Sequence, residues 1–207
     1  NDPLMGQMIG DEAFIKAIQE VRKNKAFKAV LLRINSGGGS ALASDNIVHE
    51  LDRLAKEKPL VISMGPVAGS GGYWIASSGK KLFAQHTSIT GSIGVLSLYF
   101  QIQKLLEKHG ITADTLKNGI SADMGSALRP MTRQEKTELE NRVEVLYQDF
   151  LKRAAVFRST TTEKVHELAE GRLWLGSDAK EKNLIDETGG LREAIAYLMK
   201  ELGYTRI

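Results

Sequence analysis

The stretch "GSGGYWIAS" at residues 69–77 surrounds Ser70 with glycine and then changes to aromatic and helix-forming residues. Glycine within a helix or strand costs roughly 1 kcal/mol relative to alanine, so such a cluster needs a structural reason. One reason is a tight turn between a strand and a helix. The other is a nucleophile on an exposed elbow, where backbone N–H groups approach a substrate carbonyl.

A second glycine-rich turn, "SGGGS" at residues 36–40, lies upstream between similar elements. Apolar runs predict strands at residues 28–35, 60–65 and 81–85, and helices from residue 41 to about 56 and at 71–78. This alternation predicts an α/β fold with a mainly parallel sheet and crossover helices. Because ligands of such sheets bind beyond the carboxyl ends of the strands, both turns are expected to face one crevice.

The flanking segments predict further elements. Helical spacing over residues 11–24 predicts an amphipathic helix with Asp11 as its N-cap. Residues 87–100 predict a loop and a strand, followed by a short helix ending at Gly110, a strand at 111–117 and a long loop at 118–131. Thr132 and Glu135 have the spacing of a capping box before a long helix. A helix capped by Thr161 or Thr162, a further helix, a strand at 184–187 and a final helix complete the chain.

Composition limits the function classes. The chain has 207 residues, which favours one domain, and its net charge of +3 is too small to argue for nucleic-acid binding. It has no cysteine, which excludes thiol catalysis and disulfides, and its four histidines lack metal-ligand spacing. No apolar run approaches the roughly 20 residues that span a bilayer. Because the chain begins at Asn1, we expect a soluble fragment of a longer protein whose membrane attachment stays open.

Ser70 is the candidate nucleophile. A serine attacks a carbonyl when a base removes its proton and fixed donors stabilise the oxyanion. The N–H group of Ser70 or Gly71 at a helix N-terminus and an N–H group of the Gly37–Gly39 turn are candidate donors. Tyr73 and Trp74 are expected to pack the helix into the core. The motif differs from the GxSxG elbow of α/β-hydrolases, so these residues alone favour the plain-turn interpretation.

Four motifs in order, "INSGGGS" (34–40), "GSGGYWIAS" (69–77), "TGSIGV" (90–95) and "EGRLWLGSDAKEKNLIDETGG" (170–190), resemble the signal peptide peptidase A family. Its members are Ser–Lys peptidases with a ClpP/crotonase-like fold of repeated β-β-α/β-α units. The resemblance covers nearly the whole chain. It implies a single peptidase domain over residues 1–207, without the family's first strand and without a cofactor, that degrades remnant signal peptides.

The resemblance also implies roles for individual residues. Ser70 would be the nucleophile, Gly38 or Gly39 together with Gly71 would supply the oxyanion-hole amides, and Ser92 would orient a lysine or a water. Five apolar residues are candidates for a substrate pocket: Met64, Val67, Ile93, Val95 and Leu96. The other turn serines, Ser36, Ser88 and Ser126, are expected to hydrogen-bond the backbone. The family further implies a homo-oligomeric ring and membrane association, with the domain on the periplasmic or extracytoplasmic side.

Two positions depart from the family pattern. Gly37 replaces a proline, and Ala122 stands where the single-domain members carry the general-base lysine, in a loop that has no lysine. An engineered Lys→Ala change, loss of activity, or a lysine from another domain or subunit would each explain this. The sequence "ADMGSALRP" resembles the serine-bearing carboxyl-terminal copy of two-copy members, whose other copy carries the lysine, and this favours the third explanation.

Lysines of the chain itself are weaker candidates for the base. Lys117 is the nearest alternative, but an exposed strand lysine is expected there, and Lys80 and Lys81 should point away from the crevice. The sequence therefore predicts a serine peptidase domain that is incomplete alone. The alternatives are an inactive scaffold for oligomerisation or partner binding and, with less support, a crotonase-like acyl-CoA enzyme.

Overall fold

The computed structural model describes residues 9–204. The chain divides into two compact units. Unit 1 comprises Asn1–Gly94 and Asp149–Ile207, and unit 2 comprises Val95–Gln148. Unit 1 contains the sheet and both glycine-rich turns, whereas unit 2 contains the loop with Ala122.

The sheet of unit 1 is mostly parallel. Its six strands are β1 (Val30–Ser36), β2 (Leu60–Gly69), β3 (Lys81–Ala84), β4 (Ile89–Gly91), β5 (Leu173–Leu175) and β6 (Glu187–Thr188). The strand order is β5-β4-β2-β3-β6, and β1 pairs with β2. Only the β4–β5 pair is antiparallel. The predicted α/β class with parallel strands is confirmed.

β2 is the central strand and has different neighbours along its length. Its first half pairs with β3 through Val61–Ser63, and its last residues pair with β4 through Val67–Gly69. β1 accompanies β2 over most of that length. The strand therefore leaves one neighbour and joins another just before it reaches Ser70.

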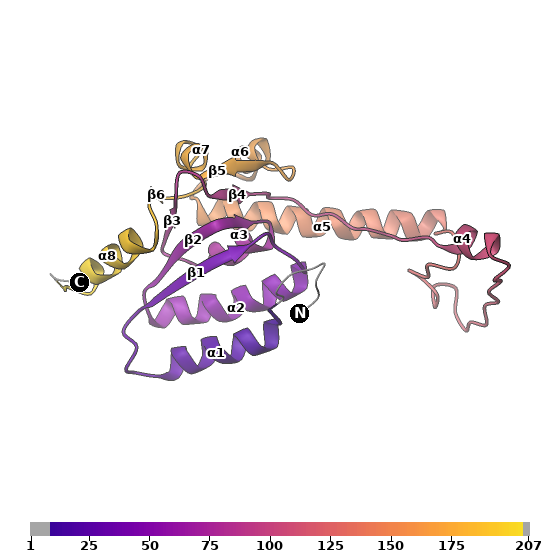
Figure 1. Cartoon of the computed structure of the whole chain (residues 1–207), viewed down its shortest axis with the longest axis horizontal. Coiled ribbons are helices and arrows are strands. Elements are labelled where there is room, and N and C mark those ends of the chain that lie inside the picture. The colour runs from indigo at the N-terminus through magenta and orange to yellow at the C-terminus, as the bar shows by residue number, and fades with distance from the viewer. Residues whose placement is uncertain (1–8, 205–207) are drawn as a thin grey trace. The chain divides into compact units, whose positions relative to one another are not determined.

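Helices cover the sheet of unit 1. They are α1 (Asp11–Lys23), α2 (Ala41–Glu57), α3 (Gly71–Ala76), α6 (Thr162–Leu168), α7 (Gly176–Glu181), α8 (Leu191–Glu201) and the part of α5 (Arg133–Phe157) from Asp149 onward. α1 lies beside α2, which contacts α3, while α8 packs on β1, β2 and β3 (Figure 1). The side chain of Ser40 caps α2 by accepting a hydrogen bond from the Ala43 N–H.

The core of unit 1 forms around β2 and α3. Val61, Ile62 and Met64 of β2 are completely buried. Tyr73 is also completely buried, and its hydroxyl donates a hydrogen bond to the Leu184 carbonyl at 2.8 Å. The ring of Trp74 packs against Phe150 with centroids 4.6 Å apart. The prediction that Tyr73 and Trp74 anchor the helix in the core is confirmed.

Unit 2 contains α4 (Gln103–Lys108), a turn-rich segment and the first part of α5. The predicted loop at 118–131 and the long helix after it are confirmed. The predicted strand at 111–117 is wrong, because this stretch is irregular and pairs with no strand among the described residues. The predicted strand within residues 87–100 is limited to β4, and its apolar continuation is irregular.

The ends of some other helices and strands differ from the predicted ends by a few residues. The N-cap of α1 is Gly10, and Asp11 is the first helical residue. The strand expected at 184–187 forms at Glu187–Thr188, because Leu184 and Ile185 are buried and the Leu184 N–H bonds the Ala179 carbonyl. β5 has no counterpart among the predicted elements. Its three residues are too few to show an alternating pattern.

Candidate active site

Ser70 is the corner between β2 and α3. Its backbone has φ 50° and ψ −122°, a conformation that residues other than glycine rarely adopt. Its N–H donates to the Gly91 carbonyl at 2.9 Å, and its carbonyl accepts the Trp74 N–H at 2.9 Å. The residue is therefore tied to β4 on one side and to the first turn of α3 on the other. Such strained corners persist only where the surrounding structure holds them, and they are frequent at functional sites.

The two glycine-rich turns meet at Ser70. A methyl group on Gly38 would lie 2.8 Å from both the Ser70 Cβ and the Gly71 nitrogen, and 3.1 Å from the Ser70 Oγ. A methyl group on Gly71 would lie 3.4 Å from the Gly38 Cα and from the Gly39 nitrogen. Gly38 also has φ +106°, so both its conformation and the close approach require glycine. The two turns, which were predicted to face the same side of the sheet, are therefore in direct contact.

Three backbone N–H groups surround this contact, and they differ in their partners. The Gly38 N–H donates to the Ser36 Oγ at 3.2 Å. The N–H groups of Gly39 and Gly71 donate to no acceptor within residues 9–204. Gly71 begins α3, and the first N–H groups of a helix lack intrahelical partners. Gly39 and Gly71 therefore offer two donors beside the Ser70 side chain.

Within unit 1, no described residue forms a hydrogen bond through which it could act as a base on the Ser70 hydroxyl. The residue is partly exposed, and its Oγ makes no hydrogen bond with another described residue. Lys80 pairs with Glu201, and this hydrogen bond raises the pKa of Lys80. Lys81 pairs with Glu187 at 3.3 Å. Both ammonium groups are engaged with these carboxylates.

Ser44 of α2 and Ser36 of the first turn pack against the glycines that follow Ser70. Ser44 on α2 is buried, and its Oγ donates to the Ser40 carbonyl at 3.0 Å. A methyl group on Gly71 would lie 2.5 Å from this Oγ, and one on Gly72 would lie 2.7 Å from the Ser36 carbonyl oxygen. Ser44 was not a sequence candidate. The sequence feature that could have identified Ser44 is its position four residues after Ser40, the N-cap of α2, on the face of α2 that is buried.

β4 supports Ser70 from the other side. Ser92, immediately after β4, has φ 48° and donates its N–H to the Arg172 carbonyl at 2.7 Å. A methyl group on Gly69 would lie 3.4 Å from the Ser92 Cβ. Ser92 is therefore a neighbour of the residue that precedes Ser70. Its proposed role toward a lysine or a water stays a prediction.

The five apolar pocket candidates are in different surroundings. Met64 and Ile93 are completely buried in unit 1, and Val67 is partly exposed. Val95 and Leu96 belong to unit 2, where Leu96 is 78% exposed. Among these residues, Val67 of unit 1 and the two residues of unit 2 have surface available for a ligand.

Ala122, the position expected for a lysine, is exposed in the turn-rich segment of unit 2. Lys117 lies nearby, with its ammonium 2.8 Å from Asp123 Oδ1 and 3.1 Å from the Ile120 carbonyl. Lys117 is exposed, as predicted, although it is not part of a strand. Its ion pair with Asp123 engages the group that a general base would need free.

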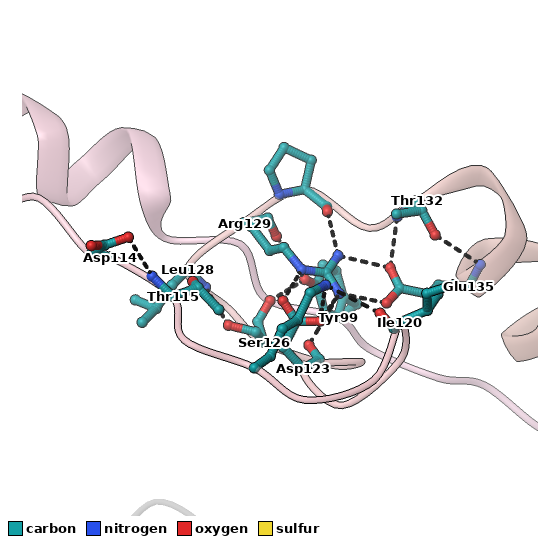
Figure 2. A network of polar contacts seen from close by, with 12 residues as sticks. Tyr99, Asp114, Thr115, Ile120, Asp123, Ser126, Leu128, Arg129, Thr132 and Glu135 are labelled. Carbon is teal, nitrogen blue, oxygen red and sulfur yellow. Dashed lines mark hydrogen bonds and ion pairs between the residues drawn. The ribbon is translucent and has the colours of Figure 1, made fainter.

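Arg129 holds the segment around Ala122 to the start of α5 (Figure 2). Its guanidinium bonds both carboxylate oxygens of Asp123, at 2.6 and 2.8 Å, and also bonds Glu135. The Thr132 N–H donates to Glu135 Oε2 at 2.8 Å, and the Glu135 N–H donates to Thr132 Oγ1 at 3.2 Å, which confirms the capping box. The Arg129 hydrogen bonds lower the pKa of Glu135 to about 2 and hold the pKa of Asp123 below its ordinary value.

Within residues 9–204, no group of three or more histidine, cysteine, aspartate or glutamate residues is placed to hold a metal ion. Across the same residues, no helix combines the length and apolar character needed to span a membrane.

Known proteins resemble this chain over most of its length. A family model described as peptidase family S49 matches residues 52–205. The chain is 42% identical to the chloroplastic serine protease SPPA of Arabidopsis thaliana over 92% of its own length, and 36% identical to protease 4 of Haemophilus influenzae over 90%. It is 35% identical to protease 4 of Salmonella typhi over 91% of its length. It spans 28%, 30% and 30%, respectively, of the lengths of these relatives.

Proposed function

The chain belongs to peptidase family S49, and from this premise we propose that it is the serine-bearing domain of an SppA-type endopeptidase. The family has a ClpP-like fold, in agreement with the mostly parallel sheet and its crossover helices. One observation carries the proposal: Ser70 is held at a strained corner against Gly38, with the N–H groups of Gly39 and Gly71 beside it. The activity of the whole protein is part of the proposal, because the chain spans less than a third of these relatives.

Acyl transfer at this site would follow from the positions of these groups. The Ser70 Oγ attacks the peptide carbonyl carbon, and the carbonyl oxygen becomes an oxyanion between the Gly39 and Gly71 N–H groups. A neutral lysine amine takes the Ser70 proton and passes it to the leaving amine. Water then hydrolyses the acyl-enzyme with the same amine as base, and Ser70 is regenerated.

The lysine is proposed to come from another domain or subunit. The Ser70 Oγ has no hydrogen-bond partner among the described residues, and Lys80, Lys81 and Lys117 are paired with carboxylates. An ordinary lysine has a pKa of about 10.4, so the base must be desolvated or lie near positive charge to be neutral near neutral pH. A base site completed by a second domain or subunit would supply both the amine and that burial.

Substrates and partners follow from the same proposal. Remnant signal peptides are apolar, and unit 2 carries exposed apolar side chains suited to bind them or to contact further subunits of a ring. Leu96, Leu98 and Phe100 are each more than 70% exposed. A location on the extracytoplasmic side of a membrane is part of this proposal, because the family resemblance implies it. A single peptidase domain over residues 1–207 is part of this proposal.

Chemical rescue tests the proposed mechanism. The purified chain should hydrolyse an apolar peptide ester near the background rate. Added ethylamine should raise that rate as the pH approaches the amine pKa, which is close to lysine's value of about 10.4, because the free amine then acts as base. The increase should vanish in Ser70→Ala. A serine-directed fluorophosphonate should label Ser70 faster with ethylamine present.

The same experiment distinguishes the alternatives. An amine effect of equal size in Ser70→Ala would show that Ser70 is not the nucleophile. A folded chain that neither hydrolyses the ester nor reacts with the fluorophosphonate at any amine concentration would support the inactive scaffold.

A further inference from the structure

The pairing of β2 with β1 is interrupted at the point where β2 changes its other neighbour. The β1–β2 register runs from Ile34↔Met64 to Ser36↔Ala68, so β1 advances two positions while β2 advances four. The residues Gly65, Pro66 and Val67 therefore form a bulge, named here the β2 bulge. Before the bulge β2 pairs with β3, and from Val67, the last residue of the bulge, β2 pairs with β4. A bulge bends its strand and redirects the residues that follow.

The β2 bulge leaves backbone polar groups that the ladder does not satisfy, and two side chains bind them. Ser88 is completely buried, and its Oγ donates to the Gly65 carbonyl at 2.7 Å and accepts the Gln85 N–H at 3.1 Å. On the β1 side, Asn35 Oδ1 accepts the Val67 N–H at 3.3 Å. Pro66 has no N–H to satisfy. The bulge is thus held from both neighbouring strands.

Close packing adds to these hydrogen bonds. A methyl group on Gly65 would lie 2.9 Å from the Asn35 Cβ and 3.1 Å from its Oδ1, so the Asn35 side chain lies directly on Gly65. Ser88 immediately precedes β4, and its carbonyl accepts the Gly176 N–H at 2.8 Å. Ser88 therefore joins the start of β4 to the bulge and to the segment after β5.

We infer that Ser88 and Asn35 are positioning residues that set the Ser70 corner by holding the β2 bulge in register with β4. β4 pairs with Val67–Gly69, and its Gly91 carbonyl accepts the Ser70 N–H at 2.9 Å. If the bulge relaxes, this register and the bond to Ser70 change together. The inference rests on the proposed function for its catalytic meaning, but the backbone effect can be measured without catalysis.

The first test is amide hydrogen exchange and nuclear magnetic resonance on the full chain. Ser88→Ala should accelerate exchange of the Ser70 N–H by at least about tenfold, as expected for loss of a buried hydrogen bond, and shift the Ser70 and Gly71 resonances. Ser63→Ala is the matched control. Ser63 is also a buried serine of β2, but it precedes the bulge and accepts a hydrogen bond from Arg33 at 2.6 Å. Ser63→Ala should leave the Ser70 signals unchanged.

Asn35 provides a second pair of variants should Ser88→Ala fail to fold, because Asn35 is exposed. Asn35→Leu removes the acceptor and should reproduce the Ser70 shifts, whereas Asn35→Asp keeps an acceptor oxygen and should restore the native signals. If the Ser70 N–H exchanged at the same rate in Ser88→Ala and in Ser63→Ala, the proposed role of Ser88 would be overturned. Native Ser70 signals in Asn35→Leu would overturn that of Asn35.

A peptidyl boronic acid separates this inference from the proposed function. In the unmodified chain, boron-11 resonance should report a tetrahedral adduct that Ser70→Ala abolishes, and Ser88→Ala should weaken its binding by at least about tenfold. Absence of the adduct in the unmodified chain would overturn the nucleophile assignment. The amide exchange result would still decide whether Ser88 and Asn35 hold the corner.

Discussion

At the residue scale, the candidate site is defined by the side chain of Ser70 and by the lack of a side chain on Gly38. Ser70 has a positive φ that is unfavourable for serine, and Gly38 lies so close that no Cβ fits between the two turns. The strain at Ser70 is offset by its hydrogen bonds to β4 and α3. The three glycines of the "SGGGS" turn are therefore not equivalent, and this distinction leads to a direct test.

We predict that Gly38→Ala disrupts the site whereas Gly37→Ala does not. The added methyl at Gly38 would lie 2.8 Å from the Ser70 Cβ and the Gly71 nitrogen, while nothing lies within 4 Å of one at Gly37. Gly38→Ala should lower the free energy of unfolding by more than about 1 kcal/mol, because its φ is also positive. Urea denaturation measures the free energy of unfolding, and the rate of fluorophosphonate labelling measures the reactivity of the Ser70 hydroxyl. Equal effects of the two variants would contradict the contact of the turns.

At the element scale, the last turns of α5 hold α2 and α3 together. Arg153 makes paired hydrogen bonds to Asp52 of α2, at 3.0 and 2.9 Å, and donates to Ser78 at 3.0 Å. It also contacts Ser77, the C-cap of α3. One guanidinium thereby joins α5, α2 and the end of α3, the helix that follows Ser70.

Arg153→Met should lower the free energy of unfolding by about 1–3 kcal/mol, because it removes charge-assisted hydrogen bonds from partly buried partners. Lys152→Met is the control. Lys152 is exposed, and its partner among the described residues is Asp149 at 3.3 Å, so its loss should cost less than about 1 kcal/mol. Urea denaturation of both variants checks the difference. A loss of stability in Lys152→Met as large as that in Arg153→Met would argue against the role of Arg153 in joining the three helices.

The start of α5 should respond to acid. Arg129 lowers the pKa of Glu135 from its ordinary value of 4.5 to about 2. Because the folded-state value is the lower one, the stabilisation is complete above pH 4.5 and is lost as the pH falls toward about 2. The protection of residues 118–135 against amide exchange, relative to the intrinsic exchange rate at each pH, should therefore fall in this interval. Glu135→Gln should reduce the pH dependence and leave the part that comes from the lowered pKa of Asp123, and an unchanged acid response in that variant would refute the assignment.

At the scale of the whole molecule, one surface feature suited to assembly is a row of exposed apolar residues in unit 2. Leu96, Leu98 and Phe100 alternate along an extended segment and are 78%, 74% and 72% exposed. Tyr99 between them is anchored, because its hydroxyl bonds the Arg129 carbonyl at 3.0 Å. The row is thus held on a fixed segment, in keeping with the proposed ring.

Leu98→Lys should lower the oligomeric state, because a charge in an apolar interface is costly to desolvate. Light scattering coupled to size-exclusion chromatography, over a range of protein concentrations, measures this. Val156→Lys, at a single valine that is 80% exposed on the part of α5 in unit 1, should leave the assembly unchanged. Identical masses for Leu98→Lys and the unmodified chain would exclude the row from any interface.

Local signals predicted much of this protein. Glycine turns after apolar runs placed Ser70 and Gly38 at strand ends, and the spacing of Thr132 and Glu135 predicted the start of α5. These signals work because caps, turns and helical periodicity depend on residues a few positions apart. The lack of a lysine in the loop with Ala122 was likewise visible in the sequence.

Tertiary structure alone decided which distant groups meet. Residues 111–117 have a strand-like sequence but find no partner strand among the described residues, whereas the three-residue β5 forms because β4 lies beside it. The roles of Ser44, Ser88 and Asn35 depend on contacts with Gly71 and Gly65, which lie far away in the sequence. Strand pairing and close backbone approach are long-range interactions, so their energies are determined only when the whole sheet has assembled.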